Sequence, residues 1–169
     1  NLKIQTNVIE SSWLSGVKRL LFLGSSCIYP KFASQPIKEE CLLSGEIEET
    51  NQWYAIAKIA GIKLCAALRK QHNFDAFSLM PCNLYGPNDN YDLKTSHFFP
   101  ALIVKALEAK KNKKKLILWG SGKPKRELMY VDDLADACIY FLKKQTKDSL
   151  INIGTGIEKS IFQYAKFIL

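Results

Sequence analysis

Two short apolar segments with sharp ends constrain the fold of this chain most. Residues 17–23 read Val-Lys-Arg-Leu-Leu-Phe-Leu and stop at Gly24, and residues 74–80 stop at Pro81. Apolar residues at helical spacing over residues 2–14 precede the first segment. A helix followed by a short buried strand is typical of α/β proteins with a parallel sheet. The sequence therefore predicts an α/β fold whose ligands bind beyond the carboxyl ends of the strands.

The remaining elements follow from periodicity and from the positions of Gly and Pro. An alanine-rich run without Pro predicts a helix over residues 53–71, and the stretch before it, which contains two prolines, predicts a long loop. Thr95 or Ser96 is expected to cap the next helix. The full set is a loop at 29–52, a turn at 83–87, helices at 97–110, 132–144 and from Ser160, and extended segments at 116–119, 127–131 and 150–153.

Composition and charge exclude several classes of protein. The chain has 169 residues, 47% of them hydrophobic, and no apolar run long enough for a membrane span or a signal peptide. Its five cysteines show no metal-ligand spacing, so we expect no metal site and a reduced, cytoplasmic location. The first residue is Asn and the last lies in an apolar-periodic run. We therefore expect this sequence to be part of a longer chain.

The net charge is +8, and the basic residues cluster at positions 110–115 and 123–126. The lysines at 110–115 are typical of a solvated helix end, where cations suit the helix dipole. A nucleic-acid surface would need interleaved aromatic residues or a known module, and neither is present, so no nucleic-acid partner is expected. The cluster of Lys123, Lys125 and Arg126 is better suited to an anionic small molecule such as a nucleotide diphosphate.

Tyr54 and Lys58 are spaced to lie on one face of the predicted helix. A neighbouring ammonium favours the ionised form of a phenol, so such a pair can transfer a proton during carbonyl reduction. The same spacing also occurs on solvated helices without function. Ser25 follows the first strand, where its hydroxyl could polarise a substrate carbonyl, although a simple turn of small residues has the same composition.

The order of these motifs resembles the short-chain dehydrogenase/reductase superfamily. Strand-Gly24-Ser25-Ser26, a loop and then Tyr54-x-x-x-Lys58 carry the resemblance, and Tyr85-Gly86-Pro87 and residues 152–156 resemble its extended branch. Residues 21–30 (LFLGSSCIYP), 54–63 (YAIAKIAGIK), 81–87 (PCNLYGP), 96–97 and 119–122 resemble the GDP-L-fucose synthase family. The resemblance implies a doubly wound, Rossmann-like sheet with a smaller substrate-binding portion, NADP(H) as cofactor and a GDP-sugar as substrate.

The resemblance also implies roles for individual residues. Ser25, Tyr54 and Lys58 match the catalytic set of carbonyl reduction, and Cys27 and His97 match an acid/base pair for epimerisation. Taken alone, Cys27 is as compatible with a core residue, and His97 with a surface residue. The segments that match cofactor contacts are Leu23, Gly24, Ser25, Ser26, Lys58, Pro81, Cys82, Asn83, Leu84 and His97, and those that match substrate contacts are Lys105, Trp119 and Arg126.

The chain departs from the family pattern at several positions. Lys105 stands where relatives carry Arg, Cys82 stands where Thr is expected, and none of the nine glycines forms the pyrophosphate-binding motif. We therefore expect residues 1–82 and 131–153 to be the C-terminal part of the NADP-binding domain, and residues 83–130 and 154–169 to be an incomplete substrate-binding portion. This segment alone is expected to be inactive, and a homodimer is expected through helices 2–14 and 53–71. The alternatives are another nucleotide-sugar epimerase or reductase of the branch, and a non-catalytic remnant that binds GDP-sugar.

Overall fold

The computed structural model describes residues 1–169, which divide into two compact units. The first unit contains residues 1–82 and 133–153, and the second contains residues 83–132 and 154–169. The chain therefore crosses from one unit to the other three times. Each unit has a three-stranded sheet of its own.

The sheet of the first unit is fully parallel. Its strands are β1 (Arg19–Leu23), β2 (Asp75–Pro81) and β5 (Leu150–Ile153), in the order β1-β2-β5. Leu21 lies opposite Phe77, and Leu79 lies opposite Ile151. The central strand β2 is buried from Ala76 onward, which explains why it reads as a continuous apolar run.

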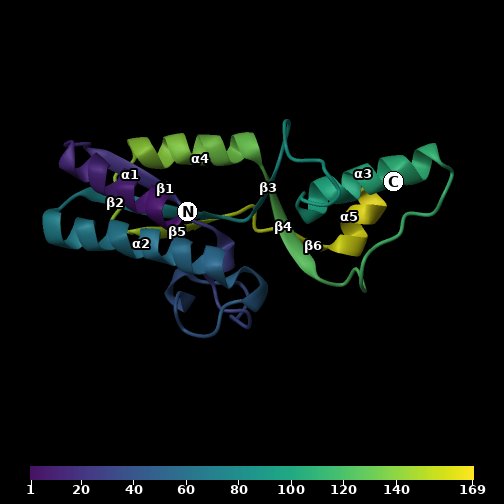
Figure 1. The fold of residues 1–169 in the computed structure, drawn as a ribbon, viewed down its shortest axis with the longest axis horizontal. Helices are drawn as coiled ribbons and strands as arrows, with labels where there is room; N and C mark the ends of the chain where they lie inside the picture. Colours follow the sequence, from purple (N-terminus) through teal and green to yellow (C-terminus); the bar gives the residue numbers. More distant parts are fainter. The chain divides into compact units, whose positions relative to one another are not determined.

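Helices cover both faces of this sheet. The helices α1 (Leu2–Leu14) and α2 (Gln52–His72) contact each other, and α2 packs on β2. The helix α4 (Val131–Lys143) runs along the other face (Figure 1). The predicted doubly wound, Rossmann-like arrangement is therefore confirmed. Its largest core cluster contains Ile9, Cys65, Leu68, Phe74 and Ala76.

Two local features fit α2 to its neighbours. Gly61 leaves room for the first strand, since a Cβ atom there would lie 2.6 Å from the Phe22 ring. At the other end, Asn73 adopts the left-handed conformation, with φ 55°, and its backbone N–H donates to the carbonyl of Leu68. Asn is one of the few residues that enter this conformation at low cost, so α2 ends where β2 must begin.

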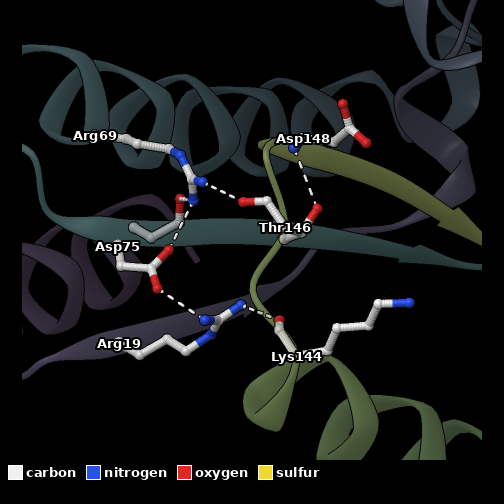
Figure 2. Close-up of polar contacts among 7 residues, drawn as sticks. Arg19, Arg69, Asp75, Lys144, Thr146 and Asp148 are labelled. Carbon is white, nitrogen blue, oxygen red and sulfur yellow. Dashed lines mark hydrogen bonds and ion pairs between the residues drawn. The ribbon is translucent and has the colours of Figure 1, made fainter.

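An ion-pair cluster ties together the amino ends of β1 and β2. Figure 2 shows Asp75 between Arg19 and Arg69, and each guanidinium lies 2.9 Å from a carboxylate oxygen of Asp75. The two arginines also donate to the backbone carbonyls of Lys144 and Thr146, in the segment between α4 and β5. The cluster therefore links β1, β2 and the segment between α4 and β5. It lies at the amino ends of the strands, whereas Gly24 follows the carboxyl end of β1.

The second unit has a small mixed sheet and two helices. The strand β3 (Asn83–Tyr85) pairs in parallel with β4 (Lys125–Tyr130), which pairs antiparallel with β6 (Glu158–Ser160). The helix α3 (Phe98–Lys111) contacts α5 (Ile161–Ile168), which starts with a capping box between Ser160 and Gln163. The core of this unit is formed by Leu102, Tyr164 and Ala165, with Phe98, Phe99, Leu116, Leu118, Leu128 and Ile168 packed around them.

Three expectations about this unit were wrong, and one of its strands was not expected at all. Residues 83–85 form a strand rather than a turn, because they pair with residues of β4 that lie 45 positions further along the chain. Local composition cannot reveal such a partner. Residues 116–119 form no strand, and Leu116 and Leu118 instead pack on the helical core. The strand β6 was missed, and the cap of α3 is His97 rather than Thr95 or Ser96.

The loop at residues 29–52 is not wholly irregular. It contains the short 3-10 turns η2 (Glu39–Cys41) and η3 (Glu49–Asn51), and a further turn η1 (Ser26–Ile28) precedes it. Among the helices, none combines the length and apolar character needed to cross a membrane.

Candidate active site

The first group of predicted site residues lies at the carboxyl end of β1. Gly24 donates its backbone N–H to the carbonyl of Leu79 at 2.9 Å, which continues the pairing with β2 by one residue. A Cβ atom at Gly24 would lie 2.3 Å from the sulfur of Met80, so only glycine fits here without movement of that side chain. The chain then turns through η1, and the Ser25 hydroxyl accepts a hydrogen bond from the backbone N–H of Cys27 at 3.4 Å.

Tyr54 and Lys58 lie in the first turns of α2, the helix that contacts η1. The Lys58 ammonium donates to the carbonyl of Leu23 at 2.8 Å and lies 5.0 Å from the centre of the Phe22 ring. The centre of the Tyr54 ring is 5.8 Å from the same nitrogen. Burial lowers the pKa of Lys58 below that of an ordinary lysine, because the charged form loses solvation. The structure thus brings Tyr54, Lys58 and the end of β1 together.

Tyr54 is accessible at this end of the unit. Its side chain is 38% exposed, and Leu23, the last residue of β1, is 40% exposed. An accessible phenol beside a constrained ammonium is the arrangement that proton transfer to a bound carbonyl requires. The Tyr54–Lys58 spacing that the sequence predicted for one helical face is therefore found on α2.

Cys27 lies within η1 and is partly exposed. By contrast, Cys65 is buried in the core, and burial raises the pKa of its thiol to about 11. Cys27 is therefore not one of the inert core cysteines, which keeps a chemical role open to it. On the neighbouring strand, Pro81 ends β2, and the backbone N–H of Cys82 donates to the carbonyl of Ile153 at 3.0 Å.

A hydrogen-bonded network holds the η1 turn against β5. The hydroxyl of Tyr29 donates to Oδ1 of Asn152 at 2.6 Å, and Nδ2 of Asn152 donates to the carbonyl of Ile37 at 3.1 Å. The backbone N–H of Asn152 donates to Oε1 of Glu39 at 2.8 Å. Burial, with the nearby Glu39 carboxylate, raises the pKa of Tyr29 to about 12. Both Tyr29 and Asn152 lie in motifs that the sequence singled out, but their link was not predicted.

The second group of predicted residues lies in the second unit. His97 is exposed and precedes α3 as its N-cap. The Lys105 ammonium lies 3.4 Å from the centre of the Trp119 ring, a short cation–π contact that leaves Trp119 78% exposed. On β3, Nδ2 of Asn83 donates to the carbonyl of Glu127 at 3.1 Å, and Leu84 follows it.

Arg126 lies on β4, opposite Lys159 of β6. Its guanidinium is exposed and donates to the carbonyl of Lys125 at 2.7 Å. The adjacent Lys125 forms a 2.7 Å ion pair with Glu158 across the strands. Lys105, Trp119 and Arg126 therefore all present accessible groups on the second unit, as binding of an anionic ligand requires.

A pocket of about 280 Å³ opens in the second unit beside these strands. It is lined mainly by aromatic and proline side chains, among which Tyr85 contacts Phe99 edge to face at 5.2 Å. The full lining is Tyr85, Gly86, Pro87, Asp89, Tyr91, Phe99, Pro100, Ile103 and Tyr130. Of this lining, only Tyr85, Gly86 and Pro87 belong to a motif that was recognised in the sequence. No group of three or more His, Cys, Asp or Glu side chains is placed to hold a metal ion.

Comparison with known proteins gives the site a family context. Residues 1–154 match the family described as the NAD dependent epimerase/dehydratase family. The chain is 57% identical over 169 residues to a GDP-L-fucose synthase of Sinorhizobium fredii and 56% identical to a putative GDP-L-fucose synthase 2 of Arabidopsis thaliana. A solved GDP-L-fucose synthetase of Naegleria fowleri, bound to NADP, superimposes with a TM-score of 0.89 at 29% identity.

The matches cover almost all of this chain but only part of each relative. They include 99% of the chain in all three cases, and 54%, 52% and 54% of the Sinorhizobium, Arabidopsis and Naegleria proteins. The chain thus spans about half the length of the relatives that it matches.

Proposed function

Because the chain belongs to the NAD dependent epimerase/dehydratase family, we propose that it is the catalytic and substrate-binding portion of a GDP-L-fucose synthase. Such an enzyme epimerises GDP-4-keto-6-deoxy-D-mannose at C3 and C5 and then reduces its C4 ketone to give GDP-L-fucose. The observation that carries the proposal is the position of Lys58, bonded to the end of β1 and one turn from Tyr54. The identity to GDP-L-fucose synthases over the whole chain supports the substrate class.

Tyr54 and Ser25 act on the C4 oxygen in the reduction. NADPH, when bound, supplies the hydride that C4 accepts. The Tyr54 hydroxyl gives its proton to the C4 oxygen, and the Ser25 hydroxyl donates a hydrogen bond to the same oxygen. Lys58 keeps a positive charge near the Tyr54 phenolate that remains, and so lowers the cost of the proton transfer.

Cys27 and His97 act in the epimerisation. Protons on the carbons next to a ketone can be removed only if the enolate oxygen is stabilised, which is a task for Ser25 and Tyr54. Inversion at each carbon needs a group that removes the proton from one face and a group that returns one to the other. A thiol and an imidazole both exchange protons near neutral pH, so Cys27 and His97 are suited to this pair of roles.

The donors in the first unit fit the nicotinamide end of NADP(H). The Lys58 ammonium can donate to ribose hydroxyls while it keeps its bond to Leu23, since an ammonium has three donors. The exposed edge of Leu23 and the turn at Gly24 leave an accessible surface at the strand end. The resemblance to the family implies further cofactor contacts at Ser25, Ser26, Pro81, Cys82, Asn83, Leu84 and His97. Binding of NADP by the Naegleria relative supports this cofactor.

Lys105, Trp119 and Arg126 bind the GDP part of the substrate. Arg126 is an exposed guanidinium suited to paired hydrogen bonds with the diphosphate. Lys105 contributes a point charge, and its contact with Trp119 holds the indole ring in a defined place.

A homodimer formed through α1 and α2 completes the proposal. These helices contact each other and expose large apolar side chains, which a second copy would cover. The exposed set is Leu2, Ile4, Val8 and Leu14 on α1 and Trp53 and Ile56 on α2. Sedimentation of the full-length gene product tests this, since Ile4→Asp with Val8→Asp should convert a dimer into monomers. A cytoplasmic location is part of the same proposal, because the reaction uses NADPH and the role proposed for Cys27 needs a reduced thiol.

Product analysis separates this function from its rivals. The full-length gene product, incubated with GDP-4-keto-6-deoxy-D-mannose and NADPH, should give GDP-L-fucose. A product reduced at C4 with C3 and C5 unchanged would identify a simple reductase of the same branch. Binding of GDP without any NADPH oxidation would identify a non-catalytic GDP-sugar-binding protein.

A further inference from the structure

The side chain of Glu127 is anchored to the turn that follows β5. Its Oε1 atom accepts a hydrogen bond from the backbone N–H of Gly156 at 2.7 Å and another from the hydroxyl of Thr155 at 3.1 Å. Gly154 makes room for the carboxylate, since a Cβ atom there would lie 2.3 Å from Oε1. A charged acceptor with two donors is among the stronger hydrogen-bonded arrangements in proteins.

The backbone next to Arg126 is held from two further sides. The carbonyl of Arg126 accepts a hydrogen bond from the hydroxyl of Tyr164 on α5 at 3.1 Å. The carbonyl of Glu127 accepts one from Nδ2 of Asn83 on β3 at 3.1 Å. Three segments outside β4, namely β3, the turn at residues 154–156 and α5, therefore meet at two consecutive residues of β4. The backbone pairing of β4 with β3 and β6 does not itself need the side chains of Tyr164, Asn83 and Glu127.

Successive residues of a strand point to opposite faces, so an anchored Glu127 sets the direction of Arg126. Arg126 has no carboxylate partner in the second unit, and its own guanidinium bond is to the adjacent carbonyl of Lys125. The orientation of the Arg126 side chain is thus determined by its backbone and not by an ion pair. A guanidinium without a carboxylate partner remains available to an anionic ligand.

We propose that Glu127 is a positioning residue, which holds Arg126 in the orientation that binds the substrate diphosphate by fixing β4 to the turn at residues 154–156. This inference rests on the proposed function, in which Arg126 contacts that diphosphate. Glu127 itself does not touch substrate. Its carboxylate accepts hydrogen bonds only from Thr155 and Gly156. These two donors reduce the electrostatic repulsion between the carboxylate and a bound anion.

The test measures GDP binding by titration calorimetry and steady-state kinetics on the full-length gene product. Glu127→Ala should weaken GDP binding and raise KM by about tenfold, with kcat little changed, because the reacting carbon is not affected. Glu127→Gln should keep most of the affinity, since its amide oxygen can still accept from both donors. Glu158→Gln is the matched control, because this acid lies on the adjacent strand and pairs with Lys125 instead.

A double variant separates positioning from general loss of structure. Arg126→Ala with Glu127→Ala should bind GDP no more weakly than Arg126→Ala alone, because both changes remove the same contact. Independent, additive losses would overturn the proposal. If Glu127→Ala does not fold, Thr155→Val removes one donor to the carboxylate, and unchanged GDP binding in this variant would overturn the proposal in its place.

The same experiment distinguishes failure of the inference from failure of the proposed function. If Arg126→Ala weakens GDP binding but Glu127→Ala does not, the positioning role alone is rejected. GDP binding that is unaffected by Arg126→Ala would reject the proposed diphosphate site, and the positioning role with it.

Discussion

The ammonium of Lys58 donates a 2.8 Å hydrogen bond to the carbonyl of Leu23, which joins the first turns of α2 to the end of β1. Leu23 is followed by Gly24 and Ser25, so the bond fixes the start of the turn on which the predicted catalytic serine lies. Tyr54 lies one helical turn before Lys58. Lys58 therefore holds α2 to β1 and also places a positive charge near Tyr54. It links the fold of the first unit to its proposed chemistry.

Replacement of this lysine should remove both roles at once. We expect Lys58→Met to lower kcat by about 10²-fold or more, because the phenolate of Tyr54 loses its cation and the end of β1 loses its tie. Activity should fall at alkaline pH as the Lys58 ammonium loses its proton. Because burial lowers the pKa of Lys58, this loss should begin at a lower pH than for an ordinary lysine. The exposed Lys63 on the same helix provides the control, Lys63→Met, which should keep full activity. A kcat unchanged in Lys58→Met would contradict this role.

Cys27 should be needed for the epimerisation step, which precedes the reduction. We expect Cys27→Ala to slow the exchange of the C3 and C5 protons with solvent deuterium by about 10²-fold or more, as loss of an acid/base group does. The exchange is followed by NMR with the full-length gene product. Cys41→Ala, which changes a partly buried cysteine of the loop at residues 29–52, should leave the exchange rate unchanged. Normal exchange in Cys27→Ala would assign the proton transfer to another residue.

The pH dependence of stability should depend on Tyr29. The pKa of Tyr29 is raised to about 12 in the folded chain, while an unfolded tyrosine ionises near pH 10. Between these values the folded state binds more protons than the unfolded state, so the free energy of unfolding falls as the pH rises. Tyr29→Phe should reduce this alkaline loss. At neutral pH it should cost about 1–3 kcal/mol, since Oδ1 of Asn152 loses its donor.

Chemical denaturation across this pH range checks the prediction. Tyr140→Phe is a suitable control, because Tyr140 is half-exposed and shows no comparable burial. An alkaline slope that is the same in Tyr29→Phe and in the wild type would show that another group causes it.

The Arg19–Asp75–Arg69 cluster should contribute to stability without affecting the substrate. Asp75→Asn leaves two partly buried guanidiniums without their anion, and we expect a loss of about 2–4 kcal/mol in the free energy of unfolding. The KM for the sugar nucleotide should not change, because Arg19 and Asp75 lie at the amino ends of β1 and β2, whereas Ser25 follows the carboxyl end of β1. Glu40→Gln removes an ion pair with Lys38 that is largely exposed to solvent, and should cost less than about 1 kcal/mol.

Much of the first unit could be predicted because its signals are local. The helix over residues 2–14 and the strand over residues 150–153 have the expected bounds, and α2 differs from its prediction by a residue at each end. β1 begins at Arg19 rather than at residue 17, where pairing with Asp75 of β2 starts. Apolar periodicity and the stops at Gly24 and Pro81 contain this information.

The second unit was harder to predict because its strands depend on partners distant in the sequence. β3 and β6 are each three residues long and exist only through β4, whereas residues 116–119 have a strand-like composition and no partner. The site also combines features that local sequence predicts with features that depend on distant residues. Tyr54 and Lys58 follow from helical spacing, but the bonds of Glu127 to Thr155 and of Tyr29 to Asn152 join residues 28 and 123 positions apart. Such pairs leave no local pattern.

The most direct test of the account is NADPH oxidation by the full-length gene product with GDP-4-keto-6-deoxy-D-mannose, followed by absorbance. We expect turnover in the wild type and a loss of about 10²–10⁴-fold in Tyr54→Phe, because the phenol that protonates the C4 oxygen is removed. GDP binding should be unchanged in the variant, since Tyr54 is not among the predicted GDP contacts. NADPH oxidation at the wild-type rate in Tyr54→Phe, or none in the wild type while GDP binds, would contradict the central claim.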